Sequence, residues 1–69
     1  MADLANSNFA PHGPEVQSMM RRLEGFADGL GLEEATTRQI AEQVITDMPM
    51  RTDDARLMEA RARMIVFSA

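Results

Sequence analysis

The acidic residues that could take part in catalysis occur as two adjacent pairs, Glu33-Glu34 and Asp53-Asp54. General acid–base chemistry needs two carboxylates that face one substrate and have separated pKa values. Neighbouring residues of a helix point about 100° apart, so neither pair forms such a site by itself. Both pairs stand near expected helix starts, where negative charge stabilises the helix dipole. We therefore interpret them as capping and solubilising residues.

The other side chains that carry chemistry are sparse. His12 is the single histidine and cysteine is absent, so the sequence lacks the ligand set of a transition-metal site and a base for a serine nucleophile on a fixed element. The glycines of residues 25–31 (GFADGLG) lack the preceding strand and the spacing of a phosphate-binding loop. We expect no catalytic residue, no metal and no cofactor, and hence no enzyme. An active site would have to be assembled from Asp, Glu and Arg side chains.

The composition limits the possible partners. The 69 residues carry a net charge of −4, which disfavours a nucleic-acid surface on electrostatic grounds. No apolar run reaches membrane-spanning length, and the N-terminus lacks the pattern of a signal peptide. We therefore expect a soluble, cytoplasmic protein. All seven basic residues are arginine, which fits either a codon bias or selection for bidentate contacts to carboxylates.

A chain this short forms one small domain, and the core of such a domain rarely contributes more than about 3–5 kcal/mol of stability. Small domains commonly add disulfides, a metal or a second subunit. Disulfides are excluded because there is no cysteine, and a single histidine disfavours a metal. Self-association is the remaining way to complete the core.

The hydrophobic periodicity predicts three helices, over about residues 14–30, 33–48 and 53–67, after a flexible N-terminal arm over residues 1–13. Pro14 suits a first helical position, and Gly29 and Gly31 suit a helix end. The short connections favour an antiparallel pair for the first two helices. The expected fold is all-α, either a three-helix bundle or a helical hairpin whose third helix reaches a second chain.

Two of these helix starts can be read in more than one way. The second helix begins either at the Glu33-Glu34 pair or at a capping box over residues 36–39 (TTRQ). Pro49 ends that helix because the residue before a proline is steered away from helical geometry. Thr52 or Asp53 then caps the third helix.

The third helix carries two apolar stripes, more than one contact can cover. At about 100° per residue, one stripe is Ala55, Met58, Ala62, Ile65 and Val66, and the other is Leu57, Ala60, Met64 and Phe67. One strip of the helix is clearly polar and is expected to face solvent: Arg56, Glu59 and Arg63. Arg61 lies between the two apolar stripes. A helix that is apolar on two sides is usually buried on both, so one stripe is a candidate interface.

We therefore predict a small acidic protein-binding module, acting as a regulator, inhibitor or accessory subunit. The third helix would dock on an apolar surface of a partner protein, with Arg56, Arg61 and Arg63 pairing with carboxylates at the rim. The predicted interface residues are Leu57, Met58, Arg61, Met64, Ile65 and Phe67.

Two alternatives stay open for the apolar helix. In the first, the extra stripe pairs with its own copy in a homodimer that needs no other partner. In the second, the apolar C-terminal run of residues 64–67 (MIVF) is the substrate segment of a ribosomal peptide precursor. Left exposed, such a run would promote aggregation.

Overall fold

The structure is a computed structural model that describes residues 13–69. This part of the chain contains three α-helices and no strand: α2 (Gly13–Leu30), α3 (Glu34–Asp47) and α4 (Asp53–Ser68). The all-α prediction with three helices is confirmed for these residues, and the helix bounds differ from the predicted ranges by one residue at most. Of the arm predicted for residues 1–13, only Gly13 belongs to the described part, where it begins α2.

The helix ends follow local chemistry. Gly31 adopts a φ of 74°, in the left-handed region that favours glycine. Its N–H donates to the Asp28 carbonyl, and the Leu32 N–H donates to the Ala27 carbonyl. These two bonds form a Schellman motif, which satisfies the last carbonyls of α2 and turns the chain toward α3.

Of the two predicted starts for α3, the structure shows the one at the Glu33-Glu34 pair. Glu33 is the N-cap residue, and its side chain makes no capping hydrogen bond. Thr37 is buried, and its hydroxyl donates to the Glu33 carbonyl at 3.1 Å. Because Thr37 lies within the first turns of the helix, the alternative capping box over residues 36–39 is not formed. At the other end, α3 stops at Asp47, two residues before Pro49.

Thr52 caps α4. Its side-chain oxygen accepts a hydrogen bond from the Ala55 N–H at 3.1 Å, which satisfies one of the first unpaired N–H groups of the helix. Asp53 and Asp54 occupy the first turn, where their charges interact favourably with the helix dipole. Of the two predicted caps, the structure therefore selects Thr52.

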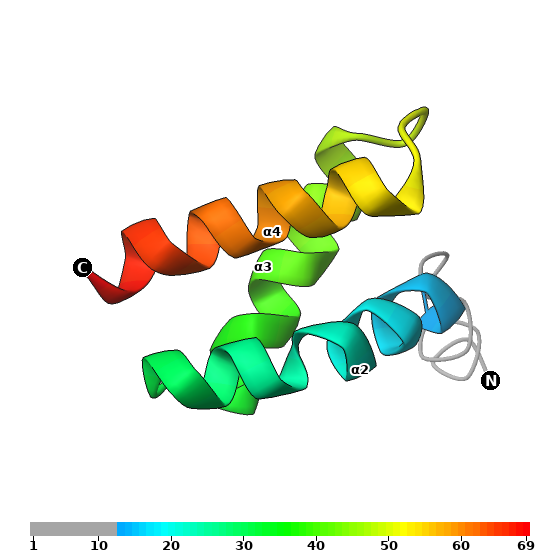
Figure 1. Cartoon of the computed structure of the whole chain (residues 1–69). Coiled ribbons are helices and arrows are strands. Elements are labelled where there is room, and N and C mark those ends of the chain that lie inside the picture. Colours follow the sequence, from blue (N-terminus) through cyan, green and yellow to red (C-terminus); the bar gives the residue numbers. More distant parts are fainter. Residues whose placement is uncertain (1–12) are drawn as a thin grey trace, which may run out of the picture.

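Each of the three helices contacts the other two. Figure 1 shows α2 and α4 running in the same general direction, with α3 crossing steeply between them rather than lying alongside α2 as an antiparallel partner. The first two helices therefore do not form the expected hairpin. Instead, α3 links two helices that both pack on it.

The core lies where the three helices meet. Leu23 of α2, Val44 and Ile45 of α3, and Met64 of α4 are among its largest fully buried side chains. The buried apolar residues are Val16, Met19, Leu23, Ala27, Ala41, Val44, Ile45, Leu57, Ala60 and Met64. The third helix thus completes the core of its own chain, and none of the helices in residues 13–69 is long and apolar enough to cross a membrane.

Candidate protein-interaction surface

The two apolar stripes of α4 meet different environments. Leu57, Ala60 and Met64 are buried in the core, and we call them the inner face. The other stripe lies on the opposite side of the helix and is largely exposed. We call it the outer face: Ala55, Met58, Ala62, Ile65 and Val66.

The outer face is exposed at its large side chains. Met58 is 70% exposed, Ile65 52% and Val66 75%. Ala62 lies between Met58 and Ile65, one turn from each, and is also exposed. Single exposed apolar residues are ordinary, whereas a contiguous apolar strip is a candidate interaction surface. The outer face is such a strip, and it runs along most of α4.

A groove of about 380 Å³ extends this strip toward α3. It adjoins the outer face at Ala62 and Val66, and Ile40 of α3 and Phe67 of α4 lie in its wall. Phe67 is 63% exposed. The outer face and the groove together form one apolar surface that spans two helices.

Burial corrects two of the predicted interface residues. Leu57 is 6% exposed and Met64 is fully buried, so both belong to the core and cannot contact a partner while the domain is folded. Met58, Ile65 and Phe67 remain exposed. The helical pattern placed apolar residues on two sides of α4 but did not say which side the rest of the chain would cover.

The predicted rim residue Arg61 is exposed and lies at the edge of the outer face. Its guanidinium carbon stands 5.7 Å from the centroid of the Phe26 ring of α2. A cation at this distance from an aromatic face is attracted to it. The contact ties α4 to α2 and leaves the apolar strip beside it uncovered.

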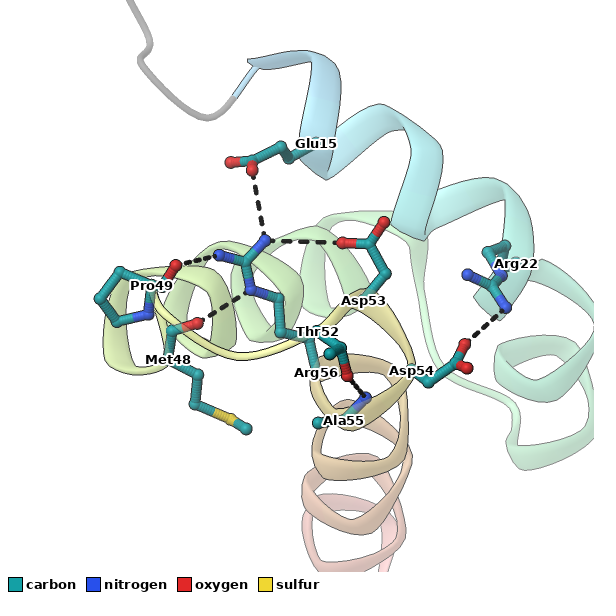
Figure 2. Close-up of polar contacts among 9 residues, drawn as sticks. All are labelled: Glu15, Arg22, Met48, Pro49, Thr52, Asp53, Asp54, Ala55 and Arg56. Atoms are coloured by element: carbon teal, nitrogen blue, oxygen red, sulfur yellow. Dashed lines mark hydrogen bonds and ion pairs between the residues drawn. The ribbon is translucent and has the colours of Figure 1, made fainter.

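Arg56 does not belong to a solvent-facing polar strip, as the sequence pattern suggested, because it is only 6% exposed. Its Nε donates to the Met48 carbonyl and its Nη2 to the Pro49 carbonyl, both at 2.9 Å. Its Nη1 donates to Glu15 Oε2 at 3.2 Å and lies 3.7 Å from Asp53 Oδ1 (Figure 2). Burial of a guanidinium is tolerable when its N–H groups are paired in this way.

The Arg56 contacts hold three segments together. The two carbonyls belong to the α3–α4 connection, Glu15 belongs to the first turn of α2, and Asp53 to the first turn of α4. Figure 2 shows the guanidinium at the centre of this arrangement. Arg56 therefore acts as a structural clamp that fixes where α4 begins, and it is not available as a rim residue for a partner.

The other predicted rim residue, Arg63, joins α4 to the end of α3. Its Nε donates to Glu59 Oε2 at 2.8 Å, and its Nη1 lies 3.0 Å from Asp47 Oδ2. Gln43 Nε2 donates to the other Asp47 oxygen at 3.1 Å. The hydrogen bonds from Gln43 and Arg63 hold the pKa of the Asp47 carboxyl below its ordinary value. The pKa of Arg63 is raised, mainly because Arg63 donates a hydrogen bond to Glu59.

The acidic pairs do not converge on a site. Asp53 faces Arg56, and Asp54 Oδ1 lies 3.5 Å from Arg22 Nη2 of α2 at the surface (Figure 2). A cleft of about 230 Å³ between α2 and the start of α4 is lined by Asp53, Arg22 and Arg56, but both arginines already pair with carboxylates. Within residues 13–69 no group of three His, Cys, Asp or Glu side chains is arranged to hold a metal ion. His12 lies outside the described residues.

Sequence reasoning missed the burial of Arg56 because its partners are set by the tertiary fold. Glu15 is 41 residues away in the sequence, and the two carbonyls belong to a connection whose path the sequence does not specify. The one available signal was position: an arginine in the first turn of α4, beside the inner-face residue Leu57.

The comparisons with known proteins add no relative. No protein-family model matches the chain, and no curated protein and no solved structure shows significant similarity to it.

Proposed function

We propose that this chain is a small protein-interaction module that docks the outer face of α4 on an apolar surface of a partner chain. A module of this kind acts as a regulator, an inhibitor or an accessory subunit. The observation that carries the proposal is the exposure of Met58, Ile65 and Val66 on a helix whose opposite side already fills the core.

The rest of the surface supports this choice of face. The acidic and basic side chains of α2 and α3 are paired or solvated across their exposed sides, as in the Arg38–Glu34 pair of α3 at 3.5 Å. The outer face has charged neighbours only at its edges, where Arg61 contacts Phe26 and Glu59 binds Arg63. An apolar centre with a polar rim is the usual composition of a protein–protein interface.

The outer face is also free to evolve separately from the fold. Because its large side chains lie outside the buried core, their identity is not required for packing of the three helices. Large apolar residues at such positions weaken solubility, so a function in binding gives a reason for their presence. Methionine suits this role because its flexible side chain adapts to a partner surface.

The proposal is tested by photo-cross-linking in the cell from which the chain comes. A photoreactive amino acid replaces Met58 in one variant and Gln39, on the exposed side of α3, in a matched control. We expect a discrete protein adduct from position 58 that the added substitution Ile65→Asp removes, and none from position 39. Equal labelling from both positions, or labelling that Ile65→Asp leaves unchanged, would contradict a docking role for the outer face.

A further inference from the structure

We infer that the partner of the outer face is a second copy of this chain, bound through an antiparallel pairing of α4 with α4. The inference rests on the proposed function of the outer face and names its partner. It is carried by the spacing, the size and the charge of the exposed residues of α4.

The spacing of the outer face is that of a coiled-coil seam. Within the outer face, Ala55, Met58, Ala62 and Ile65 follow one another at alternating steps of three and four residues, and Val66 lies beside this line. Ala69, the C-cap residue that follows α4, continues the same spacing. This heptad spacing keeps a seam facing a second helix, with each side chain inserting between residues of the facing helix. The inner face, used by the core, is separate from this seam, so both contacts can exist together.

The sizes along the seam complement one another when two copies run in opposite directions. If the symmetry axis passes between residues 63 and 64, Met58 of one copy faces Ala69 of the other, and Ala62 faces Ile65. Each layer then pairs one large side chain with one small one, and the small alanines let two helices approach closely. A self-complementary surface of this kind is what a twofold-symmetric dimer requires.

The charges beside the seam select this arrangement over two others. In a parallel pair, Asp54 of one copy would face Glu59 of the other, and like charges at these flanking positions are unfavourable. In an antiparallel pair shifted by one heptad, Arg61 would face Arg61 and Glu59 would face Glu59. With the axis between residues 63 and 64, Arg61 instead faces Ser68 and Glu59 faces Val66. No like charges then meet.

The extent of the contact predicts a weak dimer. The overlapping seam covers residues 58–68 of α4 and its C-cap Ala69, which is roughly 16 Å of helix at 1.5 Å per residue. Even with the neighbouring groove at Phe67 and Ile40, this surface falls toward the small end of specific interfaces. We expect dissociation in the micromolar range, with one chain of 7.7 kDa at low concentration.

The first test is the mass of the full chain by sedimentation equilibrium, from micromolar to millimolar concentration. We expect the mass to rise toward twice 7.7 kDa, Ile65→Asp to stay at 7.7 kDa, and Gln39→Asp, which adds the same charge to α3, to behave as the unchanged chain. Circular dichroism of each variant checks that the helices are retained. An unchanged chain that stays at 7.7 kDa throughout, or an Ile65→Asp chain that still dimerises, overturns the inference.

The second test determines the orientation by cysteine cross-linking, which has no background because the chain contains no cysteine. We expect a mixture of Met58→Cys and Ala69→Cys chains to form a disulfide-linked dimer much faster than Met58→Cys alone. Faster linkage of Met58→Cys alone would show a parallel pair and overturn the antiparallel arrangement. If the chain is monomeric but the photoreactive group at position 58 captures a different protein, this inference fails while the proposed function stands. If position 58 captures nothing, the proposed function itself fails.

Discussion

The inner and outer faces of α4 are similar in composition and differ in what covers them. Each contains a methionine and alanine together with a branched aliphatic residue, and the two faces even alternate along the same turns. Leu57, Ala60 and Met64 are covered by α2 and α3, whereas Met58 and Ile65 face outward. Apolar character alone therefore does not decide whether a residue belongs to the core. The position of the other two helices decides it.

The largest expected difference between the faces appears in neighbouring residues. Met64→Ala removes a fully buried side chain and should lower the free energy of unfolding by about 2–5 kcal/mol, because it leaves a cavity. Ile65→Ala, one residue further along, should change it by less than about 0.5 kcal/mol in the dilute monomer. Urea denaturation followed by circular dichroism measures both. Equal losses would mean that the outer face also supports the fold of the single chain.

Two arginines of α4 extend the comparison to polar contacts. Arg56→Ala should destabilise the domain by about 1.5–3 kcal/mol, because it removes the charged donor of the hydrogen bonds to two backbone carbonyls and to Glu15. Arg61→Ala loses an exposed cation–π contact with Phe26 and should cost about 0.5–1 kcal/mol. Thermal unfolding of the two variants gives the order. A larger effect at Arg61 would contradict the clamp assigned to Arg56.

The cap of α4 affects both faces equally. Thr52→Ala removes the hydrogen bond to the Ala55 N–H and should lower stability by about 1 kcal/mol, while Thr52→Ser should retain most of it. The cap belongs to the single chain, so the loss should be the same at low and high protein concentration. A loss that grows with concentration would indicate that the start of α4 takes part in the association.

The smallest expected effect concerns how the stability of the domain falls at low pH, and it involves Asp47, the partner of Arg63 in the groove wall. The pKa of Asp47 is lowered in the folded state. The main cause is the hydrogen bond that Gln43 donates to its carboxylate, and the next is the hydrogen bond from Arg63. Its contribution to stability is therefore present above the ordinary aspartate pKa of about 4 and is lost as the pH falls through the lower folded value. Asp47→Asn should flatten this part of the decline. The measurement is the urea midpoint of the unchanged chain and of Asp47→Asn, from neutral pH into acid. Midpoints that decline in parallel for the two proteins would contradict the assignment.

The helices could be predicted from the sequence because their signals are local. The apolar period of α2, the glycine that ends it and the threonine before α4 each act within a few residues, and Gly31 and Thr52 have the expected roles in the structure. The crossing of α3 over α2 and α4 was not predictable in this way. Helix direction after a short connection depends on which side chains interlock, and the periodicity does not specify that.

Sequence analysis could predict that α4 carries an apolar candidate surface, but not which residues of α4 belong to it. The pattern identified two apolar stripes on α4, but it divided the predicted contacts between them, so Leu57 and Met64 were assigned to a partner although they fill the core. The burial of Arg56 could not be predicted from the helical pattern either. Its partners, the carbonyls of residues 48 and 49 and a carboxylate of α2, come together only in the folded chain.

The central claim is that α4 uses its inner face for its own fold and its outer face for a second chain. The midpoint of thermal unfolding, measured at micromolar and at near-millimolar concentration, tests this most directly, because association with the folded state alone raises the midpoint as concentration rises. We predict such a rise for the unchanged chain and none for Ile65→Asp. A midpoint that is independent of concentration in the unchanged chain, or an equal rise in Ile65→Asp, would contradict the account.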